Sequence, residues 1–442
     1  MSGWQKTKIG EFLKQYKNTE IIKKDTSYKL VTLSNTGDIY LRKYELGSFI
    51  KANKLYKIAE GSFIYSRLSI HGGAFGLVPK SLNDAVVTDE MPVFNFDETR
   101  VDKDFFIFSI KSNDFIFQLN QLTKGVGRVR IKENSFLNLE IFLPILDEQK
   151  QIAKKLKLAE EKQKILAQEI NKQKTYLKNL RKQILQDAIA GNLTKDWREA
   201  NPTTESASEL LKKIKQEKEK LIAEKKIKKE KPLPAINENE IPFDLPKNWV
   251  WVRLGEVIVY AENLDIQKKL NPNSQISYVD IDSIDNYNHR IMRIKYKKVS
   301  ELSSRARRVL KKGFLLYSTV RPYLENIAFV DNDKENYIGS TGFNVFKTLY
   351  ADLNYIFYFL LSPNLNIKLK ELMIGFNSPS ITNLQFESIL VPLPPLAEQL
   401  AIVLKLQILM QKIDEAEQQI EKSLEYSKQL LACLLAEAFC KS

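Results

Sequence analysis

The chain repeats itself at a distance of 250 residues, and this repeat constrains its fold more than any other feature. Residues 143–149, Leu-Pro-Ile-Leu-Asp-Glu-Gln, align with residues 393–399, Leu-Pro-Pro-Leu-Ala-Glu-Gln. The same shift aligns residues 125–136 with residues 375–386 and the segments that follow the motif, without a gap. A two-fold repeat in one chain predicts two similar modules that face a partner with rough two-fold character.

A heptad pattern follows each copy of the motif. Apolar or small residues recur four and three positions apart in the first copy, with polar interruptions at Gln163 and Gln173, at Ile152, Leu156, Ala159, Leu166, Ile170, Leu177, Leu180 and Ile184. The second copy has Ile402, Leu406, Leu409, Ile413, Ala416, Ile420, Leu430 and Leu434. Such seams predict two helices, each about 60 Å long. Matched seams favour an antiparallel pair that holds two domains apart; the alternative is that each seam packs on its own domain.

The remaining sequence divides around these helices. Residues 1–143 and 246–392 mix short β-rich runs with turns, and each contains an apolar segment, 105–110 or 355–360, that fits helix or strand. Residues 144–190 and 393–442 are the long helices, and residues 191–245 form a lysine-rich, solvated helical segment and a proline linker. The predicted fold class is α+β: two mixed α/β domains, joined and spaced by two long, antiparallel, coiled-coil helices in a pseudo-two-fold arrangement.

The charge of the chain favours a polyanionic partner. The formal net charge is +14 and the pI is about 9.3, which suits nucleic acid or an acidic membrane surface. Cys433 and Cys440 lie two helical turns apart, about 10 Å, beyond the reach of a disulfide. We therefore expect a reduced, cytoplasmic chain, and the sequence shows neither a signal peptide nor a membrane span.

One stretch carries most of the excess charge. Between residues 290 and 312 the only acid is Glu301, and the cations are Arg290, Arg293, Lys295, Lys297, Lys298, Arg305, Arg307, Arg308, Lys311 and Lys312. Arginine and lysine neutralise phosphates, and arginine also forms paired hydrogen bonds with guanine. We interpret this stretch as DNA-binding; the alternative is a solvated surface patch.

Two pairs of matched loops are candidates for base contacts, because glycine permits close backbone approach and polar side chains read base edges. The first pair contributes Ser66, Arg67 and His71, matched by Thr319 and Arg321. The second contributes Lys124, Arg128 and Arg130, matched by Asn377, Ser378 and Ser380. Each of these residues could instead belong to an ordinary turn.

Motifs for catalysis are missing from the sequence. It contains no Walker A motif and no Asn-Pro-Pro-aromatic or Asp-Pro-Pro-aromatic motif of an amino-methyltransferase, and its two histidines lack metal-ligand spacing. We predict no catalytic residue and no metal site, so the chain is expected to bind rather than to catalyse.

The doubled Leu-Pro motif with its heptad helices resembles the specificity (S) subunit of type I restriction-modification systems. Residues 191–198, Gly-Asn-Leu-Thr-Lys-Asp-Trp-Arg, and residues 245–256, from Leu-Pro-Lys-Asn-Trp to Leu-Gly-Glu, also resemble that family. In the first copy, Ile145 and Asp147 depart from the proline and alanine of the motif. The resemblance covers the whole chain.

The resemblance implies that each mixed domain is a target recognition domain that reads one half of a bipartite, asymmetric DNA sequence. The helices would set the spacer and dock two methyltransferase (M) subunits and then restriction (R) subunits, through residues such as Glu148, Gln149, Ile152, Glu398, Gln399 and Ile402. S-adenosylmethionine, ATP and Mg would bind the partners, with no cofactor on this chain.

Two other readings remain open. The first is a coiled-coil adaptor or scaffold with non-specific binding to nucleic acid or to an acidic membrane, since residues 290–312 also include apolar residues. The second is a self-contained nuclease or methyltransferase, which the missing motifs disfavour.

Overall fold

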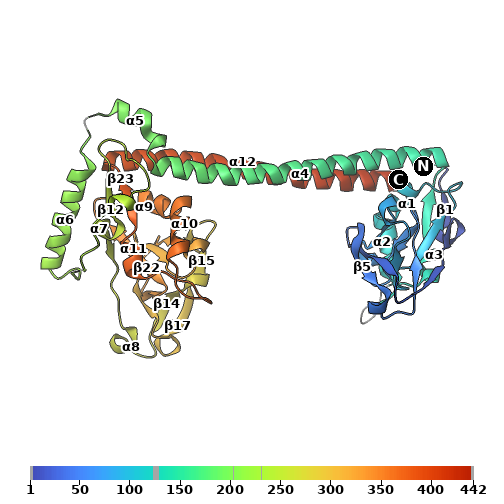
Figure 1. The fold of residues 1–442 in the computed structure, drawn as a ribbon, viewed down its shortest axis with the longest axis horizontal. Helices are drawn as coiled ribbons and strands as arrows, with labels where there is room; N and C mark the ends of the chain where they lie inside the picture. Colours follow the sequence, from blue (N-terminus) through green and yellow to red (C-terminus); the bar gives the residue numbers. More distant parts are fainter. Residues whose placement is uncertain (1–2, 123–128, 203, 230, 440–442) are drawn as a thin grey trace. The chain divides into compact units, whose positions relative to one another are not determined.

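The computed structural model describes residues 3–122, 129–202, 204–229 and 231–439. The chain forms two compact units, the first comprising residues 1–172 and 419–442 and the second residues 173–418. Two helices of 44 residues, α4 (Leu146–Ile189) and α12 (Leu396–Phe439), contribute to both units (Figure 1). Within the described residues, no helix is long and apolar enough to cross a membrane.

Besides its parts of α4 and α12, the first unit contains three small sheets and three short α-helices among the described residues. The sheets, in strand order, are β1 (Gln5–Lys8) and β11 (Glu140–Leu143); β2 (Leu13–Gln15), β10 (Val93–Phe96), β7 (Phe63–Tyr65) and β8 (Phe75–Leu77); and β3 (Asn18–Ile21), β6 (Lys54–Lys57), β9 (Val86–Val87), β4 (Ser27–Leu33) and β5 (Ile39–Leu46). The helices are α1 (Lys103–Ser109), α2 (Asn113–Leu122) and α3 (Glu133–Leu137). Phe63, Phe94, Phe106 and Phe136 form an aromatic core with ring centroids 5.1–6.3 Å from Phe63.

The second unit has a similar plan, with sheets of two, six and four strands among the described residues. They are β12 (Val250–Arg253) and β23 (Leu390–Leu393); β13 (Ile258–Tyr260), β22 (Phe343–Thr348), β19 (Leu315–Ser318), β20 (Ile327–Phe329), β16 (Arg290–Ile291) and β15 (Ile284–Asp285); and β17 (Lys295–Lys298), β14 (Gln275–Val279), β21 (Tyr337–Ser340) and β18 (Ala306–Val309). Its helices are α5 (Lys195–Ala200), α6 (Ala207–Ala223), α7 (Leu254–Val257), α8 (Ile266–Lys269), α9 (Leu353–Leu360), α10 (Pro363–Leu372) and α11 (Asn383–Glu387).

The two apolar segments that fitted helix or strand are both helices, α1 and α9. Each begins after an aspartate whose side chain accepts a hydrogen bond from a backbone N–H: Asp102 from Phe105, and Asp352 from Tyr355. These N-caps satisfy donors that a helix start leaves free, and they select helix where hydrophobicity alone does not.

The long helices run antiparallel in each unit. In the second unit, Arg181 of α4 contacts Asp414 of α12. Leu193, which follows α4, accepts a hydrogen bond from Lys405, an earlier residue of α12. As the residue number increases along α4, the number of its partner in α12 therefore decreases. In the first unit Trp4 contacts both Glu148, at the start of α4, and Phe439, at the end of α12. The fold class predicted from the repeat, two mixed domains with two long coiled-coil helices, is confirmed.

Some predicted seam positions are exposed. Leu156, Ile170, Ile402, Leu406 and Ile413 are buried, whereas Leu180 and Leu430, equivalent under the repeat, are 47% and 62% exposed. Arg181, next to Leu180, faces α12 instead and binds Asp414 at 2.6 Å. The apolar seam, which polar residues already interrupt in the sequence, is therefore less continuous still in the structure.

The lysine-rich segment is less solvated than its composition indicates. Helix α6 buries Ala207, Leu210 and Ile214 in the core of the second unit. At its C-terminal half, Lys218 donates to the carbonyl oxygen of Gly255 at 2.5 Å, and Lys215 pairs with Glu256 at 3.0 Å. The helix is amphipathic and packs against its domain.

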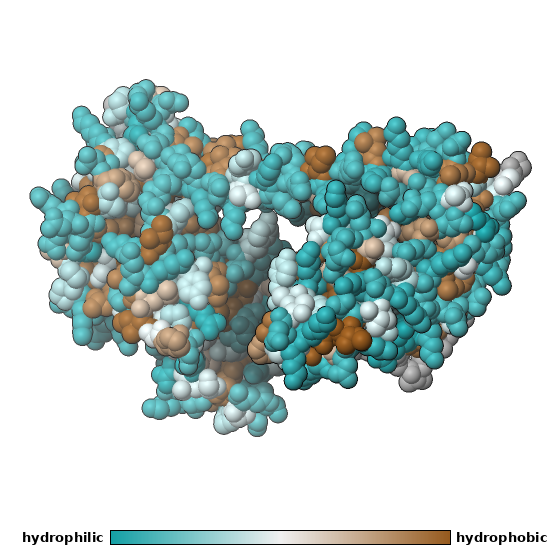
Figure 2. All heavy atoms as spheres, turned by 45° about the vertical axis from the view of Figure 1, so that its right-hand side comes forward, coloured by the Kyte–Doolittle hydropathy of each residue, from teal (hydrophilic) through white to brown (hydrophobic). Residues whose placement is uncertain are grey.

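Hydrophilic side chains cover most of the face of the molecule shown in Figure 2, and hydrophobic residues form separate patches on it.

Candidate nucleic-acid interface

The basic stretch between residues 290 and 312 lies on strands β16, β17 and β18 of two neighbouring sheets. It contains no α-helix, so it lacks the amphipathic helix that binding to an acidic membrane would require. The strands instead present their cations along two sheets, where side chains alternate between faces.

Three of the ten cations pair with acids of the protein itself, and a fourth is partly buried with no hydrogen-bond partner for its Nε among the described residues. Lys295 pairs with Asp280, Arg290 with Asp285 at 3.6 Å, and Arg307 with Asp265 at 3.3 Å. Arg308 is half-buried, and burial lowers the pKa of its guanidinium. Six exposed cations have no acidic partner among the described residues: Arg293, Lys297, Lys298, Arg305, Lys311 and Lys312. These six are the cations of the stretch that remain free to neutralise phosphates.

In the first unit, the predicted base-contacting residues divide into internal and exposed groups. Arg67 is half-buried and binds Glu133 at 2.5 Å, and Arg130 binds Glu90 at 3.1 Å. Burial opposes ionisation of Glu133, but the hydrogen bond and positive charge of Arg67, together with a backbone hydrogen bond and the charge of Lys17, outweigh it and lower the pKa of this carboxyl. Ser66 is half-buried, and His71 is exposed in a short 3-10 turn. Lys124 and Arg128 lie outside the described residues.

In the second unit, the structure brings the two predicted loops together. Arg321 donates from Nη2 to Asn377 O at 2.9 Å, and its backbone N–H donates to Pro379 O at 2.8 Å. Ser380 forms an isolated antiparallel β-bridge with Val320, and the side chains of Asn377 and Ser378 are exposed. Thr319 is 8% exposed and donates to Gly342 O at 3.0 Å. Residues that lie nearly sixty positions apart in the chain thus form one polar surface, with Thr319 beneath it.

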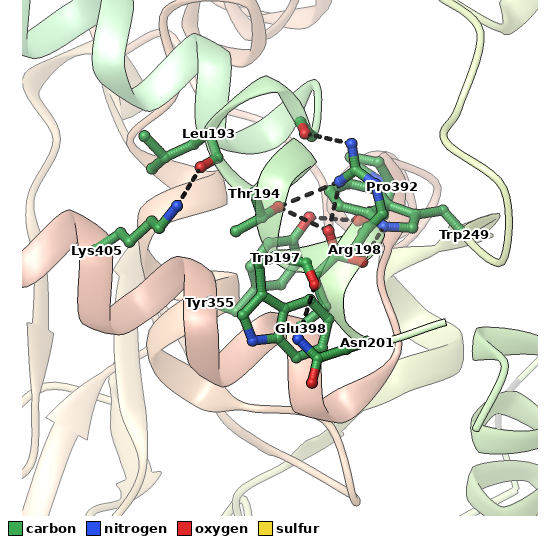
Figure 3. A network of polar contacts seen from close by, with 11 residues as sticks. Leu193, Thr194, Trp197, Arg198, Asn201, Trp249, Tyr355, Pro392, Glu398 and Lys405 are labelled. Atoms are coloured by element: carbon green, nitrogen blue, oxygen red, sulfur yellow. Dashed lines mark hydrogen bonds and ion pairs between the residues drawn. The ribbon is translucent and has the colours of Figure 1, made fainter. Parts of the chain in front are cut away.

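The start of α12 contains a buried carboxylate network (Figure 3). Glu398 is 1% exposed and accepts three hydrogen bonds, from Trp249 Nε1 at 2.7 Å, Thr194 Oγ1 at 2.7 Å and Arg198 Nη1 at 2.5 Å. The Arg198 guanidinium also lies over the Trp249 ring and donates to Gly191 O at 2.7 Å. A buried carboxylate needs such a charged partner to offset its desolvation.

The neighbouring glutamine connects the same helix to the domain. Gln399 is fully buried; its Oε1 accepts from Asp352 N at 2.7 Å and its Nε2 donates to Pro394 O at 2.8 Å. The first unit repeats this arrangement, because Gln149 accepts from Asp102 N at 2.9 Å and donates to Pro144 O at 2.9 Å. Glu148 accepts from Trp4 Nε1 at 3.1 Å and remains partly exposed.

The six residues expected to dock a partner differ in burial. Gln149, Glu398, Gln399 and Ile402 are at most 1% exposed, so their side chains hold each helix start to its own domain. Glu148 and Ile152 are half-buried. Docking by the helices through these residues stays a prediction.

The partners of these residues were not identified from the sequence. The sequence motifs 191–198 and 245–256 contain Thr194, Arg198 and Trp249, but no pattern in them indicates that these three side chains meet at Glu398. A usable signal did exist: each half of the repeat contains a tryptophan at its start and Glu-Gln at its helix start. Within the described residues, no group of three or more histidine, cysteine or acidic side chains is placed to hold a metal ion.

The chain is similar in sequence to a known family of proteins. The type I restriction modification DNA specificity domain matches residues 1–174 and 246–426. The specificity subunits of the type I restriction enzymes EcoAI and EcoEI, both from Escherichia coli, are 31% identical over 59% of the chain, but these matches span only 44% and 43% of those proteins. The MjaVIII specificity subunit from Methanocaldococcus jannaschii is 24% identical over 95% of the chain and 90% of that protein.

Two solved structures share the fold at low identity. The HsdS subunit from Thermoanaerobacter tengcongensis is 18% identical with a TM-score of 0.60, and the match covers 99% of this chain and 97% of that one. A chain from a structure concerning assembly and conformational transition of the type I R-M system is 17% identical, with a TM-score of 0.64 and coverage of 99% and 98%. The family model covers most of the sequence, and the chain therefore belongs to the type I restriction-modification DNA specificity domain family.

Proposed function

We propose that this chain is the DNA specificity subunit of a type I restriction-modification complex. Each mixed domain would read one half of a bipartite, asymmetric target. The observation that carries the proposal is that two domains with one topological plan present different polar surfaces: six free cations and the Arg321 loop surface in the second unit, and the His71 loop in the first. A common plan with different surfaces suits two ligands of one class.

The cations would position the duplex and the loops would read it. Lysine and arginine that neutralise phosphates release counterions, so binding weakens steeply with salt but carries no sequence information. Exposed Asn377, Ser378 and Arg321 offer the donors and acceptors that distinguish base edges in the major groove. Thr319 would support this surface from beneath, and Arg67 would support the His71 loop within the first unit.

The chain would act without catalysing a reaction itself. In this proposal the long helices set the unread spacer and dock two methyltransferase subunits, and restriction subunits then join, in the cytoplasm. S-adenosylmethionine, ATP and Mg would be bound by those partners. Extrusion and methylation of an adenine would occur in the methyltransferase pocket.

Methylation mapping tests the proposal. The full chain is co-expressed with a candidate amino-methyltransferase subunit, and adenine methylation is mapped across the host chromosome. We expect one bipartite motif that depends on this chain. Methylation that persists without the chain, or a motif without two separate halves, would contradict the proposal.

A second experiment addresses the spacer. Insertion of one helical turn into α4 should change the number of unread bases between the half-sites and leave both half-sites unchanged. Mapping that showed an altered half-site with an unchanged spacer would refute the role of the helices as a spacer.

A further inference from the structure

Strand β5 (Ile39–Leu46) forms one edge of the five-stranded sheet in the first unit. Its sequence, Ile-Tyr-Leu-Arg-Lys-Tyr-Glu-Leu, leaves Tyr40 52% exposed and Tyr44 60% exposed, with Arg42 and Lys43 exposed between them. It pairs with β4 on one side only, so its outer backbone groups have no strand partner among the described residues. Aromatic and basic residues on an open edge form a surface that suits a polyanion with flat bases.

A β-bulge displaces the arginine of this strand. Leu30 pairs with Lys43 and Val31 pairs with Leu41, so Arg42 has no residue opposite it. Bulges bend an edge strand and redirect a side chain. Lys43 pairs with Glu45, but Arg42 has no acidic partner within the described part of the chain. Its charge is therefore available to a ligand.

The second unit contains a strand in the same topological position. Strand β5 pairs antiparallel with β4, which pairs parallel with β9; likewise β17 pairs antiparallel with β14, which pairs parallel with β21. Both β5 and β17 are edge strands. The sequence of β17 is Lys-Tyr-Lys-Lys, in which Tyr296 is 61% exposed and Lys297 and Lys298 are free cations.

The basic composition of residues 290–312 indicates that β17 is a DNA-binding strand, whereas β5 lies in a segment of mixed charge. Only the matched sheets show that exposed tyrosines and cations occupy the same edge in both units. The edge strands β5 and β17 carry the same kinds of side chain at the same position of a duplicated fold. This equivalence indicates that both strands bind the same class of ligand.

The turn that leads into β5 also touches the predicted His71 loop. A Cβ atom on Gly73 would lie 2.4 Å from Asn35 O, and one on Gly76 would lie 2.4 Å from Gly37 O. Glycine is therefore needed at both positions, because the turn packs directly on this loop. The β4–β5 turn and the His71 loop thus form one continuous piece of surface.

We propose that β5 is the principal DNA-contacting strand of the first unit, the counterpart of β17 in the second. Arg42 binds a phosphate, and the Tyr40 and Tyr44 hydroxyls donate to phosphates or base edges of one half-site. The inference rests on the proposed function and specifies which surface of the first domain carries it. The competing occupant, a second copy of the chain paired along the open edge, is treated as an outcome of the test.

Site-directed cross-linking can test the equivalence of the two strands. In a Cys433→Ser, Cys440→Ser background, Tyr44→Cys and Tyr296→Cys each carry a photoreactive group, and Lys80→Cys, an exposed position in the first unit, serves as the control. The full chain, assembled with its methyltransferase, is irradiated on the mapped target. We expect Tyr44→Cys to cross-link within one half-site, Tyr296→Cys within the other, and Lys80→Cys to give neither.

Binding measurements provide an independent readout. Arg42→Ala should weaken binding to the target about tenfold and reduce the slope of log affinity against log salt by about one, whereas Lys80→Ala should change neither. Because Arg42 is exposed and unpaired, the variant should fold like the wild type.

The outcomes separate this inference from the function beneath it. A wild-type complex with no bipartite target overturns both. Suppose that the wild-type complex binds its target, but Tyr44→Cys gives no cross-link and Arg42→Ala has the same salt dependence as the wild type. This result overturns only the role of β5. A wild-type dimer in sedimentation that Arg42→Ala dissociates, with DNA affinity unchanged, assigns the edge to a second copy and also overturns it.

Discussion

The two helix starts have the same sequence plan and different surroundings. At the start of α4, Glu148 accepts one hydrogen bond from Trp4, whose ring packs against Phe105 and Phe439 with centroids 6.0 and 6.5 Å away. At the start of α12, the equivalent Glu398 accepts from Trp249, Thr194 and Arg198 and is almost fully buried. Thr194 and Arg198 come from the segment after α4. An aromatic contact in one unit is therefore replaced by a buried charged network in the other.

This difference predicts unequal costs for the same substitution. Glu398→Ala leaves the Arg198 guanidinium, the Trp249 N–H and the Thr194 hydroxyl without their acceptor, and breaking a buried pair in this way costs about 3–5 kcal/mol. Glu148→Ala removes one hydrogen bond at a partly exposed site, and should cost about 1 kcal/mol. Urea unfolding with hydrogen exchange assigned to each unit measures both, and equal losses would contradict the comparison.

The charged partner in the second unit should matter nearly as much. Arg198→Ala leaves a buried carboxylate with two neutral donors, which we expect to lower the free energy of unfolding by about 2–4 kcal/mol. Arg198→Lys should restore less than half of this loss, because a single ammonium cannot reach Glu398, Thr194 and Gly191 O and also cover the indole. Full rescue by lysine would show that only the charge is needed.

The glutamines should behave alike where the glutamates differ. Gln149 and Gln399 each accept from the backbone N–H of an N-cap aspartate and donate to a proline carbonyl. Replacing either by alanine leaves buried backbone groups unsatisfied, at about 1–3 kcal/mol. Thermal unfolding of the two single variants should therefore give similar shifts. A loss confined to one unit would mean that the repeat does not extend to this bond.

The smallest expected effect concerns pH, and its sign differs between the units. Burial raises the pKa of Glu325 in the second unit, although Asn366 donates to its carboxylate at 2.5 Å. Its folded-state pKa exceeds its unfolded one, so stability falls as pH rises through that window. Glu133 in the first unit has a lowered pKa, so its contribution is lost as pH falls through the folded value.

Glu325→Gln retains the acceptor and removes the desolvated charge. We expect it to raise stability slightly at neutral pH and to remove the decline that occurs as pH rises through the raised pKa of Glu325. Glu133→Gln should instead lower stability at neutral pH. Denaturation followed from pH 4 to 8 distinguishes the two, and a loss of stability for Glu325→Gln at neutral pH would contradict the assigned sign.

The frame was predictable because its signals are local. A four-and-three spacing predicts a helix from neighbouring residues alone, and the repeat shows that the helix occurs twice. The apolar segments 105–110 and 355–360 were ambiguous until Asp102 and Asp352 were seen to cap them. The partners of Glu398 lie 149, 200 and 204 positions away, so no local pattern could have joined them.

The candidate interface shows the same division. Composition indicated residues 290–312, but only the structure shows that Lys295, Arg290 and Arg307 are held by acids of their own unit while Lys297 and Lys298 are free. Strand β5 has too little net charge to stand out, and its significance depends on the order of strands in a sheet. Whether a cation is available to a ligand depends on its neighbours in space.

By itself, the sequence determined that the chain is duplicated, that two long helices follow the duplicated motif, and that a polyanion is the favoured partner. These properties follow from periodicity, similarity and summed charge, which need no coordinates. The tertiary structure alone decided that Gln149, Glu398 and Gln399 are buried, that loops 319–321 and 377–380 meet, and that matched edges carry exposed tyrosines and cations. Burial and pairing depend on contacts between distant segments, and only the folded chain brings those segments together.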